Sequence, residues 1–426
     1  MSYPETIKAD LTSNPFMRNP IPEYQRLRES GDLVCLKLPF IGKTWAATSY
    51  ESVNAVLKDQ ATFVREPRNA GLSNDQVVRW WMPGFVKAMM TSMIARDEPD
   101  HRRLRSLVEK AFVKQNVETL RERIASIANR HLEQMEKQAG TSGDVDLIQN
   151  FARPIPFVVI CELLGVPEGD RHILEKHMGP LSSVRSAWGV FRALPGIKKV
   201  LNYFREQFEL CRRNPRPGLV SDLVHVEQEG DRLSEDELLS MVVLLFFAGH
   251  ETTVHLISHC VLTLEMHPEA KQQLRNDWTM LETAVEEIHR FASPVQMTKP
   301  RYLSKDVELS GRHLKKGQSM IAFLAGANYD PSKFAEPEQL RLERSPNPHL
   351  GFGTGIHVCQ GLKLARAETQ VAIRALYETF PDLKLSQTYE QIRWNRRIGI
   401  RGMKALPIQL GNSAEGFRPE LARRSA

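Results

Sequence analysis

The chain has 426 residues, of which 42% are hydrophobic and 25% are charged, so it carries enough apolar material for a large buried core. This composition excludes an intrinsically disordered chain, a collagen-like repeat and a small scaffold held by disulfides. The net charge of +6 is small for this length and is not the balance of a nucleic-acid-binding protein. We therefore expect no nucleic acid as a partner.

The cysteines and the hydropathy pattern indicate where the protein works. No Cys-x-x-Cys pair is present, and an odd number of cysteines cannot all pair with one another. The first ten residues lack the apolar stretch of a signal peptide, and the longest apolar run, 241–248, is far shorter than the roughly 20 residues that span a bilayer. We expect a cytoplasmic protein without a membrane partner, and reduced thiols at Cys35, Cys161, Cys211, Cys260 and Cys359.

Hydrophobic periodicity predicts a β-hairpin over 32–49, then a long helical region, and short strands over 301–323 and 392–410. We expect a mainly α protein with small β-sheets, organised as one domain over 1–426 with residues 411–426 as a loose tail. The predicted helices span 51–57, 101–111, 117–138, 148–164, 200–213, 235–266, 268–274 and 281–290.

The helix predicted over 235–266 contains residues that are unfavourable in a buried helix. Ser234 and Glu237 form a capping box at its start, and its 32 residues span about 48 Å. Residues 241–248 are apolar on every side of the helix, which predicts complete burial, yet 249–253 read Gly-His-Glu-Thr-Thr. A glycine in a helix costs about 1 kcal/mol relative to alanine, and a buried unpaired charge costs several kcal/mol. Such local conflicts are typical of functional sites.

This polar interruption has two interpretations. Gly249 allows a large flat group to approach the backbone, while Glu251 and Thr252 place a carboxylic acid beside a hydroxyl that can pass protons inward. Alternatively, the segment is a solvated polar patch in which Thr hydroxyls bond to the carbonyl four residues earlier and bend the helix. The segment alone does not decide between them.

A second motif supplies a candidate metal ligand. Residues 352–361 read Phe-Gly-Thr-Gly-Ile-His-Val-Cys-Gln-Gly and lead into a helix predicted over 362–377. Cys359 thus lies at a helix N-terminus, where the helix dipole and free N–H groups favour a thiolate over a thiol. A thiolate is a soft anionic ligand that suits iron.

Other interpretations of this loop fit less well. A dinucleotide-binding loop needs a glycine three residues after Gly353 or Gly355, and none is there. A structural zinc site needs four ligands, whereas His357 and Cys359 supply two. A Cys–His nucleophile lacks an oxyanion signature, and an inert buried cysteine leaves the flanking glycines unexplained.

The two motifs together resemble the cytochrome P450 family. The cysteine loop matches the family's haem-binding pattern, Phe-Gly-x-Gly-x-His-x-Cys-x-Gly, at every fixed position, and 248–253 match its oxygen-binding helix. A third family motif, Glu-x-x-Arg, stands at Glu287 and Arg290, and its usual arginine partner corresponds here to Arg341 or Arg344. The resemblance covers essentially the whole chain, and its departures are Gln360 after the cysteine and glutamate instead of aspartate at position 251.

The resemblance implies the cytochrome P450 fold, with haem b (iron protoporphyrin IX) between the long central helix and the cysteine loop. Cys359 is the expected axial ligand of the haem iron, and Glu287 with Arg290 supports the fold beside it. The expected propionate contacts are His101, Arg105, Arg301 and His357, and the other expected haem contacts are Ala248, Gly249, Phe352, Gly353 and Gly361. For His101 and Arg105, the alternative is a basic helix face exposed to solvent.

The implied activity is haem-thiolate monooxygenation, the insertion of one oxygen atom of O2 into a bulky apolar molecule by hydroxylation or epoxidation. The family members that this chain resembles most tailor polyketides and macrolides. Thr252 and Glu251 are the expected catalytic pair, with Glu251 relaying protons. Electrons are expected from a separate ferredoxin and its reductase, docked on a basic surface with Arg103, Lys110 and Lys114. The alternatives are a peroxide-driven haem-thiolate oxidase and a haem-based redox or gas sensor without enzymatic activity.

Residues 80–93 are rich in tryptophan and methionine, which predicts a large apolar surface that adapts to the shape of a substrate. Ordinary core packing gives the same pattern. Further candidates are 181–191 and Gly399. The expected substrate pocket comprises Trp80, Trp81, Phe85, Met89, Met90, Met93, Leu244, Leu245, Ala248, Val295, Met297 and Ile398.

Overall fold

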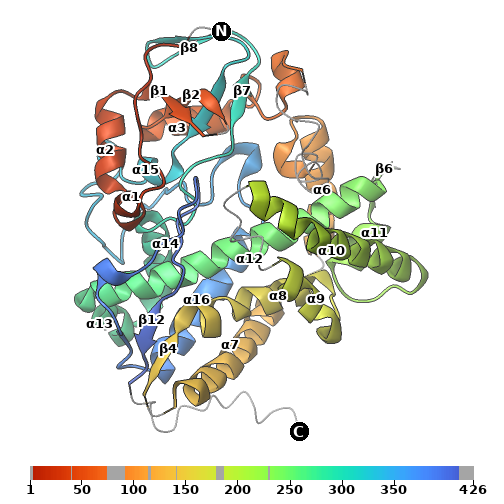
Figure 1. The fold of residues 1–426 in the computed structure, drawn as a ribbon, viewed down its shortest axis with the longest axis vertical. Helices are drawn as coiled ribbons and strands as arrows, with labels where there is room; N and C mark the ends of the chain where they lie inside the picture. Colours follow the sequence, from red (N-terminus) through yellow and green to blue (C-terminus); the bar gives the residue numbers. More distant parts are fainter. Residues whose placement is uncertain are drawn as a thin grey trace.

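The computed structural model describes residues 3–39, 41–73, 92–113, 117–140, 142–178, 187–228 and 231–411. A single long helix, α12 (Glu235–Met266), crosses the molecule and separates two regions (Figure 1). The β-rich region, which contains the N-terminal segments, lies on one side of α12, and a layer of helices lies on the other. The structure is therefore mainly α with small sheets, as predicted.

The main sheet has five strands in the order β1-β2-β10-β7-β3. The predicted hairpin is β1 paired with β2, and β10 runs parallel to β2 with Met320 opposite Trp45. The sheet thus joins the N-terminal hairpin to the segment after residue 300, which brings Arg301 beside a distant part of the chain. Its strands are β1 (Leu33–Leu38), β2 (Gly42–Ala47), β3 (Phe63–Val64), β7 (Arg301–Leu303) and β10 (Ser319–Ala322).

Three smaller sheets complete the β structure of the described residues. β12 pairs with both β11 and β4, and two short hairpins lie elsewhere. The strands predicted over 392–410 are reduced to isolated bridges and β12. The bounds are β4 (Asp144–Asp146), β11 (Lys384–Leu385) and β12 (Pro407–Gln409), then β5 (Glu227–Gln228) with β6 (Asp231–Arg232), and β8 (Val307–Leu309) with β9 (Arg312–Leu314).

The predicted helices are present, with two differences. The helix predicted over 148–164 divides into a π-helical turn, Ile148–Ala152, and α8, because Pro154 lacks an N–H and starts a new helix. α10 begins at Ala187 rather than at residue 200 and continues through Pro195. The helices are α1 (Asn14–Arg18), α2 (Ile21–Glu29), α3 (Tyr50–Lys58), α6 (Asp100–Val113), α7 (Val117–Ala139), α8 (Pro154–Leu164), α9 (Arg171–Met178), α10 (Ala187–Arg213), α11 (Leu219–His225), α13 (Pro268–Asn276), α14 (Leu281–Phe291), α15 (Leu324–Ala327) and α16 (Leu362–Thr379).

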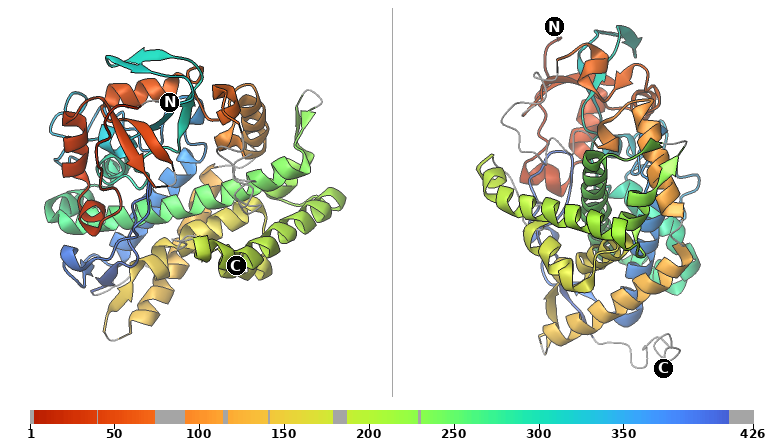
Figure 2. Two further views of the ribbon diagram at one scale, coloured as in Figure 1. Left: turned by 45° about the horizontal axis from the view of Figure 1, so that its top comes forward. Right: turned by 90° about the vertical axis from the view of Figure 1, so that its right-hand side faces the viewer.

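α12 has the bounds and the capping box that the sequence predicts. The Ser234 side chain accepts a hydrogen bond from the Glu237 N–H, and the Glu237 side chain accepts one from the Ser234 N–H. In the left view of Figure 2 the helix runs across the width of the molecule. α12 is long and apolar enough to cross a membrane, but 67% of its most apolar window is buried inside the protein, as in a core helix. Within this buried helix, residues 247–252 are the partly accessible stretch.

Candidate active site

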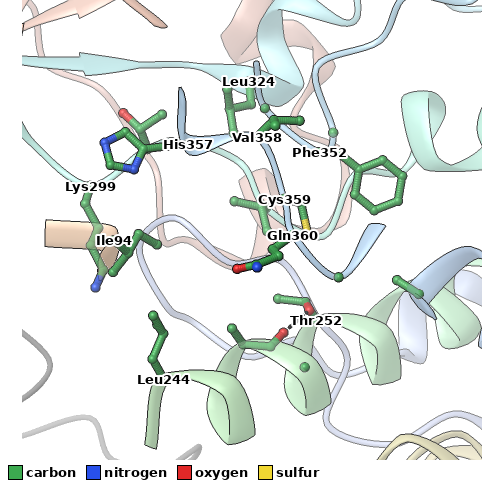
Figure 3. Close-up of a pocket in the computed structure, with 18 of the residues that line it drawn as sticks. Ile94, Leu244, Thr252, Lys299, Leu324, Phe352, His357, Val358, Cys359 and Gln360 are labelled. Carbon is green, nitrogen blue, oxygen red and sulfur yellow. Dashed lines mark hydrogen bonds between the residues drawn. The ribbon is translucent and has the colours of Figure 1, made fainter. Parts of the chain in front are cut away.

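A cavity of about 590 Å³ lies between α12 and the cysteine loop, which we define as residues 351–361. Ala248 and Thr252 form part of its wall on α12, and Cys359 lies on the opposite wall (Figure 3). Of the accessible stretch of α12, Ala248, Gly249 and Thr252 therefore face this cavity. Its volume and largely apolar lining are typical of a site for a large organic ligand.

Many residues predicted for the substrate pocket line this cavity. They are Met93, Leu244, Leu245, Ala248, Val295, Met297 and Ile398, and Gly399 joins them. The other predicted pocket residues, Trp80, Trp81, Phe85, Met89 and Met90, lie outside the described residues, as do the side chains of 181–191.

The cysteine loop is held in a fixed shape. The Cys359 N–H donates to the Phe352 carbonyl over 2.9 Å, and Gly353 and Gly355 have φ values of 68° and 74° that favour glycine. A Cβ on Gly355 would collide with the Leu57 carbonyl at the end of α3. Backbone conformation therefore requires glycine at positions 353 and 355, and close packing also requires it at 355.

Burial and the helix terminus have opposite effects on the pKa of the Cys359 thiol. Burial raises the pKa of the Cys359 thiol, and this outweighs the Gly361 N–H, Arg105 and Arg366, which lower it. The helix terminus therefore does not by itself give this thiol a lowered pKa. Coordination by a metal deprotonates a thiol outright, so the thiolate form is tied to binding of the metal.

Buried nitrogen atoms converge on one side of the cavity. The rings of His101 and His357 lie 4.4 Å apart between centroids. Among the described residues, His101 Nδ1 and His357 Nε2 are buried without a hydrogen bond, although the Glu98 carboxylate lies 3.8 Å from His101 Nδ1. Arg301 donates from Nη1 to the Phe63 carbonyl over 3.0 Å, but its Nε and Nη2 are buried and unpaired. Since buried donors without partners are costly, these four atoms indicate an anionic ligand with several oxygens.

Arg105 holds the cysteine loop. Its Nη1 donates to the Ile356 and Val358 carbonyls over 2.8 and 3.0 Å, and its Nε donates to Glu109 over 2.7 Å. Arg105 also lines the cavity, next to His101 on the same helix face. The alternative of a solvated basic helix face is therefore excluded for these two residues.

Thr252 and Glu251 have different environments. The Thr252 hydroxyl donates to the Ala248 carbonyl over 2.8 Å, so toward the cavity its oxygen acts as an acceptor. The Glu251 carboxylate forms an ion pair with Arg397 and lies 4.0 Å from His255 Nε2. Arg397 belongs to the turn that also carries the cavity residue Ile398. No sequence pattern indicates the ion pair between Arg397 and Glu251.

Gly249 has a packing role in addition to the one predicted for it. Gly249 lines the cavity, but a Cβ at this position would lie 3.1 Å from Ile160 Cδ1 on α8. The missing side chain thus allows α8 to pack closely on α12. Ala248, one position earlier, also lines the cavity.

The comparisons with known proteins agree with this geometry. The family described as Cytochrome P450 matches residues 196–396. The polyketide biosynthesis cytochrome P450 PksS of Bacillus subtilis (strain 168) is 36% identical over 93% of this chain and 96% of its own length. This chain belongs to the cytochrome P450 family.

Two further relatives are similar over most of this P450. The mycinamicin IV hydroxylase/epoxidase of Micromonospora griseorubida is 36% identical over 90% of this chain and 94% of its own. The crystal structure of myxobacterial CYP267B1 in complex with myristic acid has a TM-score of 0.85 and 35% identity, covering 94% of this chain and 99% of that one. The protein is an enzyme of the haem-thiolate monooxygenase class.

The residues of this P450 fit a haem. Cys359 supplies one sulfur ligand on one wall of the cavity, and the unpaired nitrogens of His101, His357 and Arg301 suit the two carboxylates of the macrocycle. No group of three or more His, Cys, Asp or Glu side chains in the described ranges is arranged to hold a bare metal ion. The donor set therefore suits an iron held within a macrocycle.

Arg344 is the arginine that joins the Glu-x-x-Arg pair of this P450. The Glu287 carboxylate accepts two hydrogen bonds of 2.8 Å from Arg290 and two of 3.0 Å from Arg344. Arg341 offers Glu287 its backbone N–H over 3.1 Å, while its side chain pairs with Glu336. Glu287 and Arg290 are completely buried, so this network fixes α14 against the segment before the cysteine loop.

Proposed function

We propose that this P450 inserts one oxygen atom of O2 into a bulky apolar molecule of the polyketide or macrolide type. The observation that carries the proposal is the largely apolar cavity with Cys359 on one wall and Thr252 on the other. The names of two relatives, the polyketide biosynthesis cytochrome P450 PksS and the mycinamicin IV hydroxylase/epoxidase, support this substrate class. We further propose that the chain forms a single catalytic domain and works in the cytoplasm.

In this proposal the cofactor is haem b. Cys359 would supply a thiolate ligand to its iron, and His101, His357, Arg301 and Arg105, which line the same cavity, would hold its carboxylates. When bound, haem supplies the activation of O2, so that the substrate C–H, O2, two electrons and two protons give the alcohol and water. Phe352, Gly353 and Gly361 line the same wall, and Ala248 with Gly249 lines the facing one.

Glu251 and Thr252 deliver the protons in this proposal. Thr252 offers a lone pair toward the cavity and so holds a proton-donating water in place, because its own hydrogen is bonded to Ala248. Glu251 faces Arg397 and is not among the residues that line the cavity. Its side chain must therefore leave Arg397 to carry a proton inward.

Electrons come from a ferredoxin-type protein in this proposal, which docks on the predicted basic surface. Arg103 forms an ion pair with Glu237 at the start of α12, and Lys114 lies outside the described residues. Lys110 is exposed in the last turn of α6.

We expect Lys110→Glu to slow reduction by an acidic ferredoxin several-fold at low salt, because an exposed charge acts mainly on association rates. Stopped-flow reduction at two ionic strengths measures this, and the difference should vanish at high salt. Unaltered kinetics at low salt would exclude Lys110 from the docking surface.

Oxygen labelling tests the proposed reaction. With 18O2, a surrogate ferredoxin and reductase, and a macrolide substrate, we expect a product that carries one labelled oxygen atom. Product that forms only with added peroxide, and without label from O2, would favour the peroxide-driven alternative. Ligand binding without any product in either case would favour a sensor.

A further inference from the structure

Two further cationic residues line the same cavity. They are Lys299, which lies two residues before Arg301, and Arg65, which lies just after β3. In Figure 3 the Lys299 side chain extends from the level of His357 toward Ile94, on the side of α12. Its ammonium thus faces the part of the cavity that the apolar residues Ile94 and Leu244 line.

These two side chains lack a matching carboxylate. Arg65 donates from Nη1 to the Lys299 carbonyl over 2.9 Å, which fixes the two residues beside each other, and its buried Nε has no partner. Asp97 accepts the Arg65 backbone N–H over 2.6 Å rather than its guanidinium. Within the described ranges, Lys299 has no ion-pair partner, and no aspartate or glutamate lines the cavity.

With haem bound, the cationic side chains around the cavity outnumber the carboxylates that can balance them. Two buried carboxylates lie near Arg65, Arg105, Lys299 and Arg301: Glu66, which already pairs with Arg68 and Arg96, and Asp97. Only Asp97 is thus left to balance these four cations, and a bound haem brings two more carboxylates. Glu109, the partner of Arg105, is 51% exposed, so solvent screens its charge. One positive charge therefore remains without a counter-charge at the cavity. Lys299 is exposed, so its ammonium lies where a ligand that enters from solvent can meet it.

Haem already has its partners elsewhere in the cavity. The four unpaired nitrogen atoms of His101, His357 and Arg301 converge on the side where the two histidine rings meet. Lys299 extends away from His357. The free cationic group is thus displaced from the haem carboxylate contacts toward the substrate side.

We propose that Lys299 and Arg65 form a binding site for the carboxylate of the substrate, so that this P450 prefers an apolar acid to its neutral analogue. The inference rests on the proposed function and specifies one end of its substrate. Desolvation of its ammonium and the neighbouring Arg65 lower the pKa of Lys299, and burial together with Arg301 lowers the pKa of Arg65 to about 9 against the opposing effect of Asp97. A bound carboxylate supplies that counter-charge and fixes which end of the substrate is held away from Cys359.

Titration of the haem-loaded enzyme with a matched pair of ligands tests the site. The probes are tetradecanoic acid and tetradecan-1-ol, followed by the Soret spin-state shift and by calorimetry. We expect the wild type to bind the acid at least tenfold more tightly than the alcohol. Lys299→Met and Arg65→Gln should each remove most of this preference and leave the affinity for the alcohol unchanged. Lys305→Met, an exposed lysine on the following turn, is the matched control.

Haem retention separates this site from a haem contact. The rate of haem transfer to apomyoglobin should be the same in Lys299→Met and the wild type. Faster haem loss with an unchanged acid preference would assign Lys299 to haem and overturn the proposal. A wild type that binds and oxidises acid and alcohol equally well would overturn the carboxylate site alone. Binding of neither probe would overturn the carboxylate site, whereas the proposed function is tested separately by the 18O2 experiment with a macrolide.

Discussion

Replacing Glu287 by glutamine should destabilise the fold by about 3–5 kcal/mol, the usual cost of removing one partner from a buried ion pair. The Glu287 carboxylate accepts hydrogen bonds from Arg290 and Arg344, and also from the Arg341 N–H and the Asn347 side chain over 3.1 and 3.2 Å. Glutamine removes the charge and one acceptor, which leaves the completely buried Arg290 guanidinium without a counter-ion.

Urea denaturation measures this effect, and the neighbouring Glu286→Gln is the matched control. Glu286 pairs with Arg366 and His349, but its side chain is 24% exposed, so water replaces part of what is lost. We expect a clearly smaller loss for Glu286→Gln. Equal losses for both variants would show that the buried network has no special weight in holding the fold.

The second large effect is expected at the proton-delivery site. Thr252→Ala should retain haem and bind substrate, yet form product from roughly a tenth or less of the electrons it consumes, with the remainder released as hydrogen peroxide. Thr252 presents its oxygen to the cavity as an acceptor because its hydrogen is bonded to the Ala248 carbonyl. Alanine offers no acceptor, so the water that brings the proton is no longer held.

The ratio of product to NAD(P)H consumed, measured beside peroxide release, gives the result. Thr252→Ser keeps a hydroxyl and should restore most of the coupling. Thr253→Ala, which alters the adjacent buried cavity residue, should leave the coupling near that of the wild type. Unchanged coupling in Thr252→Ala would remove the assigned role.

The features that the sequence predicts well are those encoded by residues close together in the chain. The capping box at Ser234 predicts the start of α12, Pro268 predicts its end, and the spacing of the glycines predicts the cysteine loop. Gly355 shows why such a motif is readable, because its positive φ and its contact with α3 leave no space for a side chain.

Contacts between distant segments could not be predicted in the same way. Arg344 and Arg341 lie on the same segment, and only the fold shows that Arg344 reaches the Glu287 carboxylate with its side chain. Glu251 meets Arg397 across 146 positions, and Arg65 meets Lys299 across 234. No local periodicity or motif encodes such pairs, because the sheet and the C-terminal turn bring them together only in the folded chain.

The central claim is that Cys359 provides the thiolate ligand of a haem. The most direct test is the absorption spectrum of the reduced protein under carbon monoxide, recorded beside that of Cys359→Ser. A strongly red-shifted Soret band in the wild type, absent from a Cys359→Ser protein that still carries haem, is the predicted result. The same red-shifted band in both proteins, or no haem band in the wild type, would contradict the claim.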